Sequence, residues 1–127
     1  MNKEYQPTQP VASTEPSSPA IYIKSLKPGA ILLLEGATDI YEFSIMRCPE
    51  NGIVNVSSNN AALRHGAVGQ FMHSVRWSDP GIKLDTIQKG WAMVLRFNNG
   101  TMQTQPILSA SVSGVGVDGK RWHFDVF

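Results

Sequence analysis

Apolar and polar residues alternate with a period of two along most of the chain beyond Pro19. The alternation is clearest over residues 39–47 (DIYEFSIMR), where Tyr41, Phe43 and Ile45 fall on one side. A period of two is typical of a β-strand with one buried face. The pattern predicts strands over residues 20–24, 30–35, 39–47, 53–57, 68–77, 82–88, 91–97, 101–105, 107–117 and 121–127.

Three dipeptides lie between these segments: Asn51-Gly52, Asn99-Gly100 and Asp118-Gly119. Asn-Gly and Asp-Gly accept a positive φ at both central positions of a type I′ turn, whose twist matches that of two antiparallel strands. The sequence therefore predicts three tight hairpins and an antiparallel arrangement.

Four of the expected strands have informative faces. Residues 30–35 (AILLLE) form a continuous apolar run, so we expect both faces of this strand to be covered. In residues 68–77 we expect four side chains to face inward: Phe71, His73, Val75 and Trp77. In residues 121–127 we expect three to face inward: Trp122, Phe124 and Val126. In residues 107–117 one face carries Leu108, Ala110 and Val112, and the other carries Ser109, Ser111 and Ser113.

One short helix is expected over residues 58–66, with Ser58 or Asn59 as its N-cap and Gly66 as its stop. Gly114 and Gly116 suggest a bulge or a barrel corner. The many short strands favour an all-β fold, as a small antiparallel barrel or alternatively a two-sheet sandwich. Residues 1–19 are rich in Pro, Ser, Thr and Gln, so we expect a disordered tail before a single domain over residues 20–127.

The charge is small overall and uneven along the chain. The net charge is +1, which gives no strong field toward nucleic acid or membranes. Residues 1–60 carry four basic and six acidic residues, whereas residues 61–127 carry seven basic and four acidic ones and all three histidines. The candidate binding residues for an anion come from this second part: Arg64, His65, Arg76, Arg96, Arg121 and His123.

Cations stand next to aromatic residues at Arg76-Trp77, at Lys89-Gly90-Trp91 and at Arg121-Trp122. Small β-barrels that bind single-stranded nucleic acid combine stacking rings with a basic groove. Neighbouring side chains in a strand point to opposite faces, however. We therefore expect the indole rings to point inward and not to share a surface with the adjacent cations.

No catalytic or metal-binding motif is present. The chain has neither a Gly-x-Ser-x-Gly elbow nor a phosphate-binding loop, and the histidine spacing fits no zinc pattern, so we assign no catalytic residue, metal or cofactor. If the protein were an enzyme, His73 and the pair His123 and Asp125 would be the first residues to test.

Cys48 is the single cysteine, so no internal disulfide can form and a reducing, cytoplasmic location is the simpler interpretation. The longest apolar run, 30–34, is far too short to span a bilayer, and we expect no membrane partner. No secretory signal is evident at the N-terminus.

The preferred hypothesis is a non-enzymatic β module that binds another protein or itself. The uncharged polar positions Thr101, Gln103 and Gln105, together with the alternating serines, are typical of a flat contact surface. The alternative is a small barrel that binds nucleic acid or a small anionic ligand through the basic C-terminal half.

Overall fold

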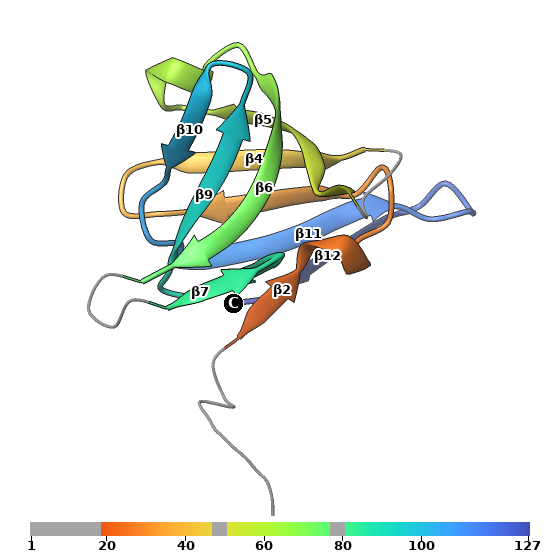
Figure 1. Cartoon of the computed structure of the whole chain (residues 1–127). Helices are drawn as coiled ribbons and strands as arrows, with labels where there is room; N and C mark the ends of the chain where they lie inside the picture. The colour runs from red at the N-terminus through yellow and green to blue at the C-terminus, as the bar shows by residue number, and fades with distance from the viewer. Residues whose placement is uncertain (1–18, 47–50, 77–80) are drawn as a thin grey trace, which may run out of the picture.

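The described part of the chain is mostly antiparallel β-strand. The computed structural model describes residues 19–46, 51–76 and 81–127, and Figure 1 shows their arrangement. The strands are β2 (Ala20–Tyr22), β3 (Ile31–Glu35), β4 (Ile40–Ile45), β5 (Ile53–Ser58), β6 (Ala67–Val75), β7 (Ile82–Leu84), β8 (Thr86–Gln88), β9 (Ala92–Phe97), β10 (Gly100–Gln103), β11 (Ser109–Val115) and β12 (Arg121–Asp125). Two short 3₁₀ turns, η1 (Ile23–Ser25) and η3 (Ala61–Leu63), are the helical elements of the described residues. The prediction of an all-β fold is confirmed.

One large sheet contains most of the strands, in the order β10-β9-β6-β5-β4-β3-β11-β12, and β7 also pairs with β6. β2 and β8 form a separate pair. In Figure 1, β6, β9 and β10 cross in front of β3, β4 and β11, so the sheet bends over on itself into two layers. Its end strands, β10 and β12, do not pair with each other in the part of the chain that the structure describes. The sheet is therefore open, and the predicted closed barrel is not formed.

Residues 104–108 explain why the sheet stays open. The Ile107 N–H donates to the Trp91 carbonyl, just before β9, at 3.0 Å. The next residue, Leu108, donates to the carbonyl of Glu35 in β3 at 2.7 Å. The chain leaving β10 thus crosses between the two layers as one extended segment, instead of pairing β10 with β12.

Gln105 fixes this crossing segment to the turn between β3 and β4. Its Oε1 accepts hydrogen bonds from the backbone N–H groups of Thr38 and Asp39, both at 3.0 Å, and its Nε2 donates to Thr38 Oγ1 at 2.7 Å. The fully buried Tyr41 donates its hydroxyl proton to Asp39 Oδ2 at 3.0 Å. The crossing segment is therefore held by side chains as well as by main chain.

Antiparallel strand pairs flank all three dipeptides, because β4 pairs with β5, β9 with β10 and β11 with β12. The β4–β5 connection is longer than a tight turn, since its nearest paired residues are Ile45 and Val54. The type I′ assignment is wrong. In the described residues only glycines and Asp85 have a positive φ, so the residues that precede the turn glycines do not: Asn51, Asn99 and Asp118. In the β11–β12 hairpin the Gly119 N–H donates to the Gly116 carbonyl at 2.9 Å, and Gly119 takes a φ of +82°. This is a type I turn followed by one left-handed glycine.

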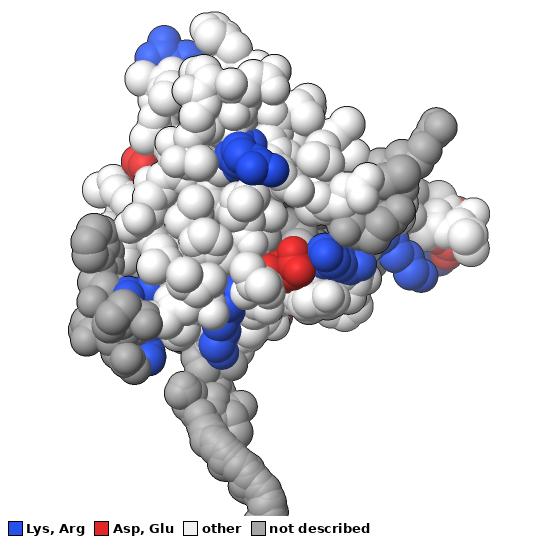
Figure 2. All heavy atoms as spheres, in the orientation of Figure 1, with Lys and Arg blue, Asp and Glu red and all other residues white. Residues whose placement is uncertain are grey.

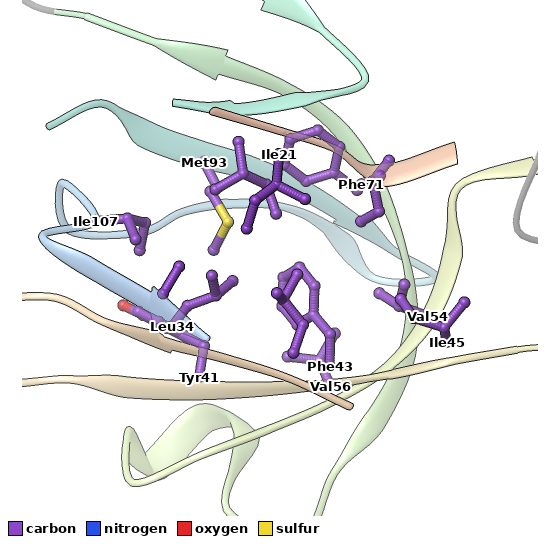
Figure 3. Packing of buried hydrophobic residues seen from close by; sticks show 14 of the residues in the cluster. Ile21, Leu34, Tyr41, Phe43, Ile45, Val54, Val56, Phe71, Met93 and Ile107 are labelled. Atoms are coloured by element: carbon purple, nitrogen blue, oxygen red, sulfur yellow. The ribbon is translucent and has the colours of Figure 1, made fainter. Parts of the chain in front are cut away.

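The hydrophobic core fills the space between the two layers. Figure 3 shows Tyr41 and Phe43 from β4 pointing toward Phe71 of β6 and Met93 of β9. These four side chains are almost fully buried. The one-sided pattern of residues 39–47 is confirmed by the burial of Tyr41, Phe43 and Ile45, and Val54 and Val56 of β5 are buried as well.

β3 is covered on one face only. Leu32 and Leu34 are fully buried, whereas Ile31 is 37% exposed and Leu33 is 36% exposed on the opposite face. The expectation that both faces are covered is wrong for the single chain, because no second layer lies on the outer side of β3 in the described residues. Its apolar outer face is therefore available for contact.

A bulge changes the predicted face of β6. The register against β9 shifts between Phe71 and His73. Phe71 is buried as predicted, but beyond the bulge Ser74 is the buried residue and donates to the Thr86 carbonyl at 2.6 Å. His73 and Val75 are only half-buried. The prediction for these two residues is wrong because an extra residue inverts the alternation.

The helix predicted over residues 58–66 is also wrong. β5 continues to Ser58, and η3 spans only three residues before β6 begins. Asn60, not Ser58 or Asn59, is the cap, since its side chain accepts from the Ala62 N–H at 3.0 Å. Gly66 ends the turn as predicted, with a φ of +79°.

Three predictions lie outside the described residues: the tail before Pro19, the environment of Cys48 and the orientation of Trp77. The Pro19 carbonyl accepts from the Lys89 N–H at 3.1 Å, so the described chain begins against the β8 end. In the described part of the chain, no helix is long and apolar enough to cross a membrane.

Candidate interaction surface

β11 lies between β3 and β12 at one end of the main sheet. Ser111 is directly opposite Leu33 on one side and Asp125 on the other. Directly paired residues project from the same face of an antiparallel sheet, so these side chains form a row. We call the outward side chains of the three strands the serine face: Ile31, Leu33, Glu35, Ser109, Ser111, Ser113, Arg121, His123 and Asp125. The predicted alternation of serines with the buried Ala110 and Val112 is confirmed. Leu108, which precedes β11, is 51% exposed and does not share the buried face.

The serine face contains an open hollow of about 470 Å³. Two polar contacts lie in it. Ser109 Oγ donates to Glu35 Oε1 at 2.7 Å, and His123 Nε2 lies 3.0 Å from Asp125 Oδ1. Leu33 adds an apolar side chain to the lining of the hollow. The hollow thus combines exposed carboxylate, hydroxyl and apolar groups.

His123 and Asp125 form an exposed pair on the serine face. Their side chains are 60% and 85% exposed, and a pair in water contributes at most about 1 kcal/mol. A nucleophile must lie within hydrogen-bond reach of its base. Among the described residues no serine hydroxyl is bonded to His123. His73, the other histidine considered, lies on β6, opposite Leu84 and Val94.

The opposite face of β12 carries aromatic side chains. Trp122 lies over Gly114 of β11, and a Cβ added at Gly114 would be 2.5 Å from Trp122 Cζ2. Phe124 stands beside Trp122, with ring centroids 5.7 Å apart, but is 64% exposed. The expectation that Phe124 and Val126 belong to the core is wrong, because β12 is the last strand of the sheet and extends beyond the residues that would cover them.

β12 has an open edge, which is the side of the strand that faces away from β11. The Lys120 carbonyl accepts from Gly116, and the Val126 N–H donates to Ala110, both at 2.8 Å. Backbone groups point to alternate sides along a strand, so the even-numbered residues of β12 bond to β11. The N–H and C=O groups of Arg121, His123 and Asp125 therefore point to the open edge, where no strand of the described residues pairs with them.

The six basic candidates are spread over the molecule. Arg64 and His65 follow η3, Arg76 follows β6, Arg96 lies on β9, and Arg121 and His123 lie on β12. In the main sheet five strands separate β9 from β12. Figure 2 shows Lys and Arg side chains at several places on one face, and at the lower right two basic groups lie close to an acidic one. The six candidates therefore lie on four separate parts of the fold: after η3, after β6, on β9 and on β12.

The contacts of Trp91 contradict the expectation that indole rings and cations do not share a surface. Its ring is nearly buried, and two cations from other segments lie over it. The Arg76 guanidinium carbon is 4.7 Å from the ring centroid, and Lys83 Nζ is 5.4 Å from it. Lys83 also donates to Gln88 Oε1 at 2.8 Å. The alternation rule is sound within one strand, but it cannot predict contacts between strands.

A metal site has no support in the geometry. The described residues contain no group of three or more His, Cys, Asp or Glu side chains that could hold an ion. Cys48 lies outside these residues. The serine face supplies one imidazole with one adjacent carboxylate, which is an incomplete ligand set.

Sequence reasoning missed β12 as an edge. It named Arg121 and His123 as anion-binding candidates and placed Phe124 in the core. One signal was present in residues 121–125 (RWHFD), where a cation and a carboxylate stand at equal distances from the central histidine. That symmetry has a meaning only once the strand is known to lie at the end of a sheet.

No family model matches this chain, and no curated protein and no solved structure matches it either. Three features of the described residues therefore bear on function: the serine face, the exposed Phe124 and the open edge of β12.

Proposed function

We propose that this domain is a non-enzymatic binding module that associates with another polypeptide, or with a second copy of itself, through the β12 end of its sheet. The observation that carries the proposal is Phe124, a large aromatic side chain that is 64% exposed on a strand with an open edge. An exposed edge is a template for pairing with another chain.

The surroundings of Phe124 support the same function. On the other side of the sheet the serine face exposes Ile31 and Leu33 beside uncharged hydroxyl groups. Contiguous exposed apolar surface with a polar rim is typical of a protein–protein contact. Both faces of β12 and its edge would thus contribute to one interface.

The alternative of nucleic-acid or small-anion binding gains no support from the placement of the six basic candidates. It stays a prediction, and the decisive measurement is binding to a single-stranded oligonucleotide at increasing salt, which weakens contacts to phosphate. The cytoplasmic location inferred from the single cysteine also stays a prediction.

A matched pair of variants tests the proposed function. Phe124→Ser changes the β12 end, and Val68→Ser changes an apolar residue that is 57% exposed at the start of β6. Light scattering measures self-association, and affinity capture followed by mass spectrometry measures binding to other polypeptides. We expect association that Phe124→Ser reduces and Val68→Ser leaves intact. A strictly monomeric chain that retains no polypeptide, or equal losses in both variants, would overturn the proposal.

A further inference from the structure

We propose that the occupant of the open edge is a second copy of this chain, with the two β12 strands antiparallel about a two-fold axis that passes through His123. The inference rests on the proposed function and names its partner. Three independent properties of residues 121–125 agree on this one register: the hydrogen-bonding phase, the charges and the aromatic side chains.

The directions of the backbone N–H and C=O groups of β12 permit this pairing. Arg121, His123 and Asp125 direct their N–H and C=O groups to the open edge, as the bonds at both ends of β12 show. With His123 on the axis, His123 faces its own copy, and Arg121 faces Asp125 of the second copy. Each of these is a pair in which both residues exchange N–H···O=C bonds. The register therefore uses every backbone group that β12 exposes at its edge.

The charges are complementary in the same register. Arg121 and Asp125 both project from the serine face, because they are two positions from His123 in opposite directions along the strand. Directly opposite residues in antiparallel strands have Cβ atoms about 5 Å apart, and opposite charges stabilise the pair. The two-fold axis creates two such pairs of opposite charge, one on each side of His123.

The aromatic side chains are complementary on the other face. Trp122 stands opposite Phe124 of the second copy, and Phe124 stands opposite the second Trp122. These are non-hydrogen-bonded pairs, in which the side chains approach most closely. Aromatic pairs across strands stabilise a sheet, and they would cover the exposed Phe124.

Neighbouring registers lack this agreement. An axis at Trp122 places Arg121 opposite His123, which removes the pairing with a carboxylate. An axis at Phe124 places Asp125 opposite His123 and moves Arg121 beyond Asp125 of the second copy. Both of these registers also leave some of the outward N–H and C=O groups of β12 unpaired. The register centred on His123 is the one that satisfies charge, aromatic and backbone requirements together.

Charge exchange tests this register. Arg121→Asp alone places Asp opposite Asp125, and Asp125→Arg alone places Arg opposite Arg121. Each single variant is expected to weaken the dimer roughly tenfold or more, since two symmetry-related pairs change from opposite to like charge. An equimolar mixture of the two variants restores opposite charges at every position. Analytical ultracentrifugation is therefore expected to show a heterodimer in the mixture and mostly monomers in each variant alone.

A cross-link provides a second readout that does not depend on affinity. In a Cys48→Ser background, His123→Cys places two thiols on the axis, at a Cα separation of about 5.5 Å, which a disulfide can span. Oxidation is expected to give a covalent dimer. Thr101→Cys in the same background, on the opposite end strand β10, is the matched control and is expected to stay monomeric.

The outcomes separate the two proposals. Restored association in the mixture and a cross-link at residue 123 support the β12 dimer. A wild-type chain that associates, but whose association ignores both charge variants, overturns the dimer and leaves the broader binding module standing. A chain that forms no dimer yet binds another polypeptide through Phe124 also overturns the dimer alone. Absence of any association overturns both.

Discussion

At both ends of the main sheet an aromatic ring covers a glycine of the neighbouring strand, but the two ends differ in what surrounds that ring. At the β10 end, Gly69 of β6 lies under the ring of Phe97, and an added Cβ would be 2.5 Å from Phe97 Cε1. At the β12 end, Gly114 lies under Trp122 at the same distance. In both places an aromatic ring from the neighbouring strand covers a glycine, which fills the space of the missing side chain.

The difference lies in the course of the chain beyond each end strand. After β10 the chain turns into residues 104–108, which Gln105 ties to Thr38 and Asp39. Phe97 is half-buried beside Leu63, Ala67 and Met102. After β12 nothing in the described residues covers Phe124. The aromatic ring at the β10 end is thus partly covered by its own chain, whereas the β12 end leaves Phe124 exposed, and both end strands keep one edge unpaired in the described residues.

The largest expected contrast compares one buried and one exposed apolar residue from the two ends. Leu95→Ala in β9 removes a fully buried side chain and should lower the free energy of unfolding by about 2–5 kcal/mol. Phe124→Ala in β12 should change it by about 0.5 kcal/mol or less when measured at a concentration that keeps the chain monomeric. Urea denaturation provides both values. Similar costs for the two variants would show that Phe124 belongs to the core of the single chain.

The next prediction concerns Tyr41, whose hydroxyl group bonds to Asp39 beside the crossing segment that follows β10. Burial raises the pKa of Tyr41 from 10.0 to about 12, and its hydrogen bond to Asp39 adds to the rise. The unfolded tyrosine ionises near pH 10 while the folded one stays protonated, so stability is unaffected below pH 10 and falls as the pH rises toward 12. The loss should reach about 2–3 kcal/mol. In Tyr41→Phe this part of the decline should be absent, and an unchanged decline between pH 10 and 12 would contradict the assignment.

Adding a methyl group at each covered glycine sharpens the comparison directly. Gly69→Ala must displace Phe97, which packs against the core, so we expect a loss of about 1–3 kcal/mol in the free energy of unfolding. Trp122 also packs against the core, but it lies on the last strand of the sheet, so we expect Gly114→Ala to cost less, below about 1 kcal/mol. Thermal unfolding of the two variants under identical conditions measures the difference. A larger cost at Gly114 would mean that Trp122 is held as firmly as Phe97.

The smallest effect is expected on the serine face. Ser109→Ala removes the hydrogen bond to Glu35, which is exposed to water, so stability should stay within about 0.5 kcal/mol of the wild-type value. The variant separates folding from binding on this face. A loss of more than about 1 kcal/mol would show that the Ser109 bond to Glu35 serves the fold of the single chain.

The sequence predicted those strands whose alternation is simple. Tyr41, Phe43, Val54 and Val56 are buried as their spacing requires, because each stands on a strand with one covered face. The alternation failed at His73, where a bulge adds one residue to β6. A bulge leaves no period of its own, and so the pattern could not show it.

The candidate surface could be predicted only in part. Arg121 and His123 were named, and the serine alternation was correct, but the exposure of Leu33 and Phe124 was not foreseen. Both residues look like core residues in sequence, since hydrophobicity reports that a side chain avoids water and not which molecule covers it. Strand order decides this, and β12 lies at an end only because residues 104–108 cross between the layers.

The position of β2 has a consequence for the order of assembly. Its only strand partner in the described residues is β8, with Ile21 opposite Ile87. The pairing of β2 with β8 closes the long loop between Tyr22 and Thr86. Closing this loop costs more chain entropy than forming a local hairpin does. We therefore expect the first described strand to leave the ribosome to be among the last to find its place, so that pulse-labelled hydrogen exchange during refolding detects protection in β4 and β5 before β2.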